Sequence, residues 1–428
     1  MEMNDMILVS VDDHVIEPPD LFRNHLPAVY QDRAPKMATM KSGSDSWVFE
    51  DRRVPNFGLN AVVGRPPEEY GMEPASYSQI RKGTYQIAQR VEDMNANGVL
   101  GSICFPTFPM FAGTFFLESK DKALARAVIS AYNDWHIDEW CGGAPGRFIP
   151  LSILPLWDID LAVAEAKRVA LKGCRTVSFP DNPVAKGLPS VHSAHWDPLW
   201  AVLAEHNIVI STHIGSGASV PYSSLDAPID AWIVNMPMYI ANATTDWLFS
   251  PIFRKFPTLK LALSEGGIGW VPYLLERADF TYRHHKAWTN ANFGDLLPSE
   301  LFKRNFITCF IDDQFGLHNT QFMNIEKITW ECDYPHSDSL WPKAPEALWA
   351  SIRHLPKESI DKITHLNAMR EFGYDPFAVL AREECTVGAL RAKAAHVDTR
   401  PVAGMGGNNP SNRNGVPVTS AEVMKLFT

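Results

Sequence analysis

The chain has 428 residues, of which 46% are hydrophobic and 21% are charged, and its formal net charge is −10. This composition is typical of a globular protein with a large core, and the absence of a basic block argues against nucleic acid or anionic membranes as partners. No apolar run approaches the ~20 residues that span a bilayer, and the acidic N-terminus is unlike a secretory signal, so we expect a cytoplasmic protein. The six cysteines form no CxxC pair, which favours reduced, buried thiols.

Short runs rich in β-branched residues alternate with helical patterns along the whole chain. Eight such runs predict strands, at residues 7–14, 99–107, 147–155, 174–180, 207–215, 259–267, 305–313 and 326–336. Helical patterns separate them, for example near 84–97, 120–141 and 270–287. A strand–helix unit repeated eight times predicts an α/β protein with the (β/α)8, or TIM, barrel fold.

Three segments are additional to the eight strand–helix units. Residues 15–83 follow the first strand and contain "SDSWVFEDRRVPNFG", which predicts a hairpin within an inserted cap. Residues 216–235 follow the fifth strand as a second loop insertion, so both insertions should lie over the C-terminal face, where barrel active sites occur. The Gly-, Asn- and Pro-rich stretch "GMGGNNPSNRNGVP" predicts a C-terminal extension at 386–428, after a metal-dependent barrel at 1–385.

Acidic and imidazole side chains stand at the ends of three predicted strands. Asp12 and His14 in "VDDHVIEPPD" are two residues apart, so an extended strand points them the same way. His213 ends "ISTHIG", and Asp333 and His336 follow the last strand in "TWECDYPH". Each alone has a simpler explanation, such as a solvated turn, a core histidine or an aspartate before a proline. The three strand ends meet at one mouth of the barrel. Asp12, His14, His213 and Asp333 together therefore predict a site with two nitrogen and two oxygen ligands for Zn²⁺, Mn²⁺ or Fe²⁺.

Four segments in this order, "VDDHVIEPPDLF", "STHIGSG", "SEGGIGWVPYLLERAD" and "CDYPHSDSLWP", resemble the amidohydrolase-related family. This branch of the amidohydrolase superfamily includes aminocarboxymuconate semialdehyde decarboxylase and resorcylate decarboxylases. The resemblance covers roughly residues 7–375. It implies that Asp12, His14, His213 and Asp333 are ligands of one metal ion, with zinc as the first choice and iron or manganese as alternatives. Relatives are often dimers, so the resemblance also implies a homodimer.

The sixth strand departs from the family pattern. Decarboxylases of the family usually end this strand with a histidine that acts as acid or base, whereas "LALSEGG" places Glu265 there. Its carboxylate is a candidate general base beside the metal, a candidate ligand for a second ion, or only a loop cap or ion-pair partner. The fourth strand, "TVSFPD", has no lysine of the kind carbamylated in dinuclear relatives, so one ion is favoured and two remain open through Glu265.

This set of residues favours a metal-dependent hydrolase. A bound metal would lower the pKa of its water towards ~7, and the resulting hydroxide would attack an ester, thioester, amide or C–C carbonyl of an organic acid. Asp333 would accept the proton, and Glu265 or His336 would protonate the leaving group, unless His336 only hydrogen-bonds Asp333. Two alternatives remain: a lyase that decarboxylates an aromatic or unsaturated acid without oxidation, and a catalytically inactive barrel that only binds a ligand.

Aromatic side chains on the mouth side of the predicted barrel indicate a small organic substrate with an apolar part. Packing of the inserted caps on the barrel explains the same residues equally well. The predicted substrate-binding residues are Trp47, Phe105, Phe179, Trp232 and Tyr239.

Overall fold

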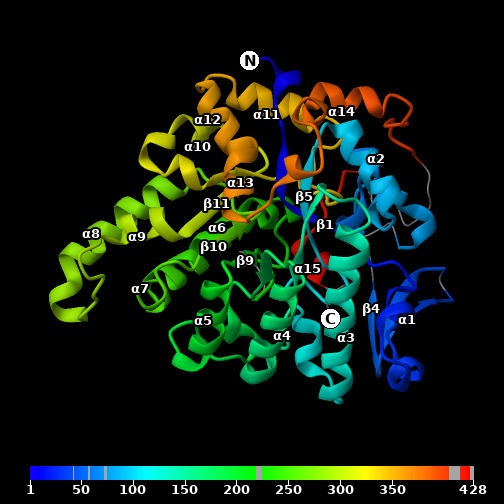
Figure 1. Ribbon diagram of the computed structural model, residues 1–428, viewed down its shortest axis with the longest axis horizontal. Helices are drawn as coiled ribbons and strands as arrows, with labels where there is room; N and C mark the ends of the chain where they lie inside the picture. Colours follow the sequence, from blue (N-terminus) through cyan, green and yellow to red (C-terminus); the bar gives the residue numbers. More distant parts are fainter. Residues whose placement is uncertain (42, 56–57, 72–74, 218–223, 404–414, 425–428) are drawn as a thin grey trace.

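The computed structural model describes residues 1–428 except 42, 56–57, 72–74, 218–223, 404–414 and 425–428. Parallel strands form its centre, in the order β6-β5-β1-β12-β11-β10-β9-β8-β7, and helices surround them (Figure 1). The strand segments are β1 (Val9–His14), β5 (Gly101–Phe105), β6 (Phe148–Ile149), β7 (Leu151–Ser152), β8 (Thr176–Ser178), β9 (Val209–His213), β10 (Leu261–Ser264), β11 (Phe306–Phe310) and β12 (Ile328–Trp330).

The two outermost segments of this order, β6 and β7, are halves of one strand and close the sheet into a barrel. Pro150 separates them, and a proline has no N–H to contribute to a strand ladder. On one side Phe148 pairs with Ser102 of β5, and on the other Leu151 pairs with Thr176 of β8. The chain is therefore a (β/α)8 barrel, and all eight predicted strands are present.

Helices of the outer layer separate successive strands, and local sequence signals fix several of their ends. Asp158 caps α4 by accepting the N–H groups of Asp160 and Leu161, and Gly98 ends α2 in the left-handed conformation. Among the described helices, none is long and apolar enough to cross a membrane. The helices are α1 (Leu21–His25), α2 (Ile87–Asn97), α3 (Lys122–Asp134), α4 (Ile159–Leu171), α5 (Asp197–Glu205), α6 (Ile229–Phe249), α7 (Ile252–Lys255), α8 (Val271–Thr289), α9 (Pro298–Asn305), α10 (Gln314–His318), α11 (Ala344–Ile352), α12 (Lys357–Asp361), α13 (Asn367–Glu371), α14 (Val387–Lys393) and α15 (Ser420–Met424).

The predicted cap contains a small antiparallel sheet of β2 (Lys36–Thr39), β3 (Asp45–Phe49) and β4 (Arg52–Pro55). The cap packs on the loops that follow β5 and β12. The guanidinium of Arg52 donates to the carbonyl of Phe115 at 2.9 Å, and the N–H of Val63 donates to the carbonyl of Pro335 at 3.3 Å. The second predicted insertion, 216–235, is a loop only in part, because α6 begins inside it.

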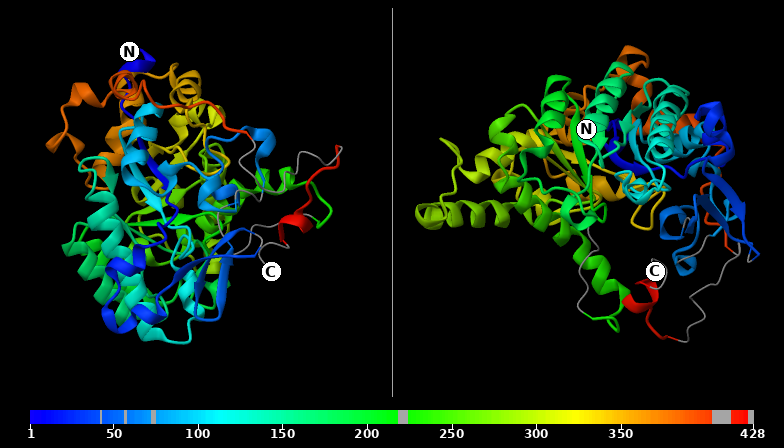
Figure 2. Two further views of the ribbon diagram at one scale, coloured as in Figure 1. Left: turned by 90° about the vertical axis from the view of Figure 1, so that its right-hand side faces the viewer. Right: turned by 90° about the horizontal axis from the view of Figure 1, so that it is seen from below.

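The predicted C-terminal extension packs on the barrel in two places. The N–H of Val387 donates to the carbonyl of Met6, which places α14 at the N-terminal end of the strands. Further along, Val418 accepts the N–H of Ile229, so α15 lies beside the start of α6 (Figure 2). Most of the Gly- and Asn-rich stretch lies outside the described residues. All six cysteines are buried free thiols, as the sequence predicts.

Candidate metal centre

A β-bulge in β1 turns Asp12 and His14 towards the barrel axis. The register between β1 and β5 shifts by one residue between Ser10 and Asp13. An extra residue on one strand exchanges the faces to which the following side chains point. Val11 belongs to the apolar cluster inside the barrel. The bulge therefore lets Asp12 follow it on the same inner face, while Asp13 turns outward.

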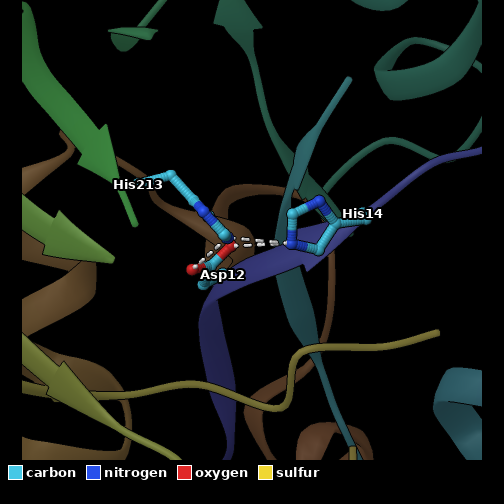
Figure 3. A group of neighbouring side chains, drawn as sticks. All are labelled: Asp12, His14 and His213. Atoms are coloured by element: carbon cyan, nitrogen blue, oxygen red, sulfur yellow. Dashed lines mark hydrogen bonds and ion pairs between the residues drawn. The ribbon is translucent and has the colours of Figure 1, made fainter. Parts of the chain in front are cut away.

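Asp12, His14 and His213 meet in the mouth of the barrel (Figure 3). His213 ends β9, which lies opposite β1 in the strand order. The Nε2 atom of His14 is 3.5 Å from Asp12 Oδ1, and the Nε2 atom of His213 is 3.5 Å from Asp12 Oδ2. The two Nε2 atoms are 3.2 Å apart. The three side chains could thus bind one cation through one atom each.

Asp333 and His336 complete the cluster from the loop after β12. Asp333 Oδ1 is 3.3 Å from His14 Nε2 and 2.9 Å from His336 Nδ1. The His336 ring stacks on the His14 ring with centroids 3.6 Å apart. Cys332 directly precedes Asp333 in sequence but packs in the outer core, as strand alternation predicts. His336 is thus placed to orient Asp333 and His14.

The polar atoms of this cluster fit a divalent cation. Both carboxylate oxygens of Asp12 and of Asp333 are buried without a hydrogen-bond partner, which is costly unless a cation balances them. Nδ1 of His213 lies 2.7 Å from the carbonyl oxygen of Ile214. That contact requires the proton on Nδ1 and leaves Nε2 with a free lone pair, which is the arrangement of a metal-binding imidazole.

Without a cation, burial pushes these groups towards their neutral forms. Burial, followed by neighbouring carboxylates, raises the pKa values of Asp12, Asp333 and Glu265 well above their ordinary range. Burial lowers the pKa of His14, and it lowers the pKa of His213 to about 3. A bound divalent ion would favour the ionised carboxylates and keep the imidazoles neutral.

Glu265 reaches the cluster from the turn after β10. Its Oε2 is 3.4 Å from His213 Nε2, and 11% of its side chain is exposed, whereas the side chains of Asp12 and Asp333 are fully buried. Glu265 is therefore the carboxylate nearest to solvent. Both Glu265 and Asp333 have left-handed backbone conformations, with φ values of 57° and 56°. Such conformations cost about 1–2 kcal/mol for residues other than glycine and often occur at functional sites.

The predicted aromatic pocket is only partly brought together. Phe105 lies inside the barrel, with its ring 5.3 Å from His213. Phe179 faces the outer helices and packs on three tryptophans, and Trp47 is fully buried against rings of the cap and the loop after β5. Trp47 lies away from the cluster because it packs between the cap and the barrel. Phe179 lies away from it because side chains alternate along a strand, and this one falls on the outer face. Trp232 and Tyr239 lie on α6, the former partly exposed and the latter buried.

Two residues at the site escaped the sequence argument. Phe111 lies in the loop after β5, and its ring is 4.2 Å from that of His213 and 5.0 Å from that of His14. No local sequence signal places it there. Glu331 is buried inside the barrel and accepts the backbone N–H of Glu265. Glu331 is two residues before Asp333, and side chains two apart on a strand point to the same face. This spacing could therefore have predicted that Glu331 lies inside the barrel.

Comparisons of the sequence with known proteins agree with the fold. A family model described as Amidohydrolase matches residues 81–374. A curated relative from Dictyostelium discoideum, 2-amino-3-carboxymuconate-6-semialdehyde decarboxylase, is 23% identical over 308 residues, which make up 70% of this chain and 80% of the relative.

Solved structures with the same fold cover most of the chain. An amidohydrolase from Mycobacterium avium subsp. paratuberculosis K-10 has 20% identity and a TM-score of 0.67, covering 86% of this chain and 99% of its own. The 5-carboxyvanillate decarboxylase of Sphingomonas paucimobilis has 19% identity and a TM-score of 0.59, with the same coverage. A dihydroxybenzoic acid decarboxylase from Polaromonas sp. JS666, solved with bound manganese and 2-nitroresorcinol, has 18% identity and a TM-score of 0.56, covering 86% and 96%.

Proposed function

Because the chain belongs to the amidohydrolase family, we propose that it is a metal-dependent enzyme that decarboxylates an aromatic or unsaturated carboxylic acid without oxidation. One observation carries the proposal: unpaired carboxylate oxygens and imidazole nitrogens converge in a buried mouth beside two phenylalanine rings. A water-poor site suits the loss of CO₂, because a carboxylate is less well stabilised there than in water. The decarboxylase names of the curated relative and of several structural neighbours support this reading over hydrolysis.

Asp12, His14, His213 and Asp333 are the residues proposed to hold a divalent ion. A bound ion would supply Lewis-acid polarisation and orientation of the substrate's oxygen atoms. Two of the neighbouring decarboxylases were solved with manganese. Zinc, the first choice from the sequence, has no such support, so Mn²⁺ is the first ion to test. Homodimer formation remains a separate proposal.

Decarboxylation leaves a carbon that must receive a proton where CO₂ departs. Glu265 is proposed as the acid, because it is the cluster carboxylate with an exposed share and therefore the one that substrate can approach. His336 is proposed to orient Asp333, because its Nδ1 lies 2.9 Å from Asp333 Oδ1. Phe105 and Phe111 would exclude water from the two imidazoles and contact the flat substrate.

Hydrolysis is the second candidate, and the identity of Glu265 favours it. A carboxylate at this position can take a proton from a water molecule that attacks a carbonyl carbon. The Glu265 side chain would therefore act as a base in hydrolysis and as an acid in decarboxylation. The two reactions differ in whether an oxygen atom from water enters the product.

The test incubates Mn²⁺-loaded protein in H₂¹⁸O with 2,6-dihydroxybenzoate, 5-carboxyvanillate and 4-nitrophenyl acetate. Decarboxylation gives one CO₂ for each molecule consumed and no ¹⁸O in the organic product, whereas hydrolysis places ¹⁸O in the product acid. The Asp333→Asn variant should bind Mn²⁺ about tenfold or more weakly and lose most of its turnover. Unchanged metal content and turnover in this variant would remove Asp333 from the site.

A further inference from the structure

Glu331 is a buried acid that the proposed reaction does not use directly. It is 1% exposed and lies two residues before Asp333, on the inner face of the barrel. Among the described residues, no lysine or arginine forms an ion pair with it. Its Oε2 atom instead accepts the thiol of Cys309 at 2.5 Å and the backbone N–H of Glu265 at 3.1 Å. A buried carboxylate with such partners needs a specific reason to be there.

The contact with Glu265 replaces a missing strand pair. The β10–β11 ladder ends with Leu263 opposite Thr308, so no residue of β11 pairs with Glu265. The strand order places β12 on the far side of β11. The side chain of Glu331 therefore reaches past Cys309 of β11 to the first N–H beyond the end of β10.

The turn that Glu331 holds is the one with the left-handed Glu265. Gly267 is also left-handed, with φ of 64°, so the chain reverses sharply here. Asp313 holds the other end of the turn, because its Oδ2 accepts the N–H groups of Ile268 and Gly269 at 2.8 and 2.6 Å. Two carboxylates, each just beyond the end of a neighbouring strand, thus fix a turn that would otherwise relax to a less strained backbone.

We propose that Glu331 is a positioning residue whose carboxylate holds the Glu265 turn, so that the Glu265 side chain stays at the mouth where the reaction takes or gives its proton. This inference rests on the proposed function for the role of Glu265. It does not depend on which of the two reactions occurs. Among the described residues, no hydrogen bond joins Glu331 to a proposed ligand, but its carboxylate is close enough to help raise the pKa values of Asp12 and Asp333.

Two substitutions separate this role from general support of the fold. Glu331→Met removes the acceptor at similar length, and Glu331→Gln keeps one carbonyl oxygen to accept the Glu265 N–H. Amide hydrogen exchange of a peptide spanning residues 264–269 should be about tenfold faster in Glu331→Met and close to wild type in Glu331→Gln. A Glu165→Met variant, which removes another buried carboxylate on α4, should leave this peptide unchanged.

Kinetics of the Mn²⁺-loaded protein provide the second measurement. In Glu331→Met, kcat measured at saturating Mn²⁺ should fall about tenfold or more with KM retained, and Glu331→Gln, which removes the same charge near Asp12 and Asp333, should recover most of the loss. In a Glu265→Gln background, Glu331→Met should change kcat less than about twofold, because both residues act through one group.

Wild-type exchange at 264–269 in Glu331→Met, or a full additional loss in the Glu265→Gln background, would overturn the inference. Failure of the proposed function looks different. In that case wild-type protein releases no CO₂ and hydrolyses no ester, while the exchange experiment still reports on Glu331.

Discussion

His136 is a fully buried imidazole on the helical turn that extends α3. Its Nε2 lies 3.0 Å from the carbonyl oxygen of Cys104, and its Nδ1 lies 3.7 Å from the thiol of Cys141. Both contacts suit a neutral ring with the proton on Nε2, and burial lowers the pKa of His136 to about 4. The His136 ring lies outside the cluster of proposed metal ligands, so its titration can be followed separately from metal binding.

The low pKa of His136 predicts a loss of stability in mild acid. Protons bind more tightly to the unfolded chain, where the pKa is 6.5, so His136 contributes stability above that value and loses it as pH falls towards 4. The loss over this range is ~3 kcal/mol. In urea unfolding, the stability difference between wild type and His136→Gln should therefore narrow by that amount. A pH-independent difference would show that the ring titrates normally.

The strands could be predicted from the sequence because each strand–helix unit carries its own signal. Alternating apolar runs and capping residues such as Asp158 act over a few residues, so they survive in the sequence. Asp12, His213 and Asp333 were found because strand ends of a barrel converge by geometry. The bulge in β1 and the position of Phe111 depend on distant partners, and no short-range pattern encodes them.

The outward face of β8 holds a side chain whose position the strand pattern alone does not decide. Phe179 follows that strand, and its ring packs 5.1 Å from the rings of Trp196 and Trp200 and 5.7 Å from that of Trp247. A position at the mouth-side end of a strand does not by itself place a side chain in the pocket. The face on which the side chain lies decides the matter, and β8 turns Phe179 towards α5 and α6.

This placement predicts that two phenylalanines of the barrel differ in their effect on substrate binding. Phe179→Ala should lower the free energy of unfolding by about 3–5 kcal/mol, because it opens a cavity among the tryptophans, and leave Mn²⁺ affinity unchanged. Phe105→Ala should also lower the free energy of unfolding. Because it removes the ring beside His14 and His213, it should in addition raise KM for the substrate. Calorimetric Mn²⁺ titration, chemical unfolding and steady-state kinetics of both variants measure this contrast. Weakened Mn²⁺ binding in folded Phe179→Ala would place this ring at the site after all.

At the scale of the whole molecule, segments far apart in sequence are tied around one barrel. The proposed ligands come from the first, fifth and eighth strands, so a bound ion would join the beginning, middle and end of the barrel. The C-terminal extension adds a second tie, with α14 at one end of the strands and α15 at the start of α6. Both ties connect regions that separate only when the barrel opens.

Metal removal should therefore lower the thermal stability of the entire protein. An ion that binds only the folded chain at 100 times its Kd adds about 2.7 kcal/mol, and for a chain of this size the melting temperature should fall by several degrees in chelator. Added Mn²⁺ should restore it, because the unpaired carboxylates of Asp12 and Asp333 regain their counter-charge. The Asp333→Asn variant is the matched control, and with Mn²⁺ binding weakened about tenfold or more its melting temperature should respond at most about half as far to chelator or Mn²⁺. An equal response in both proteins would mean that the stabilising ion binds elsewhere.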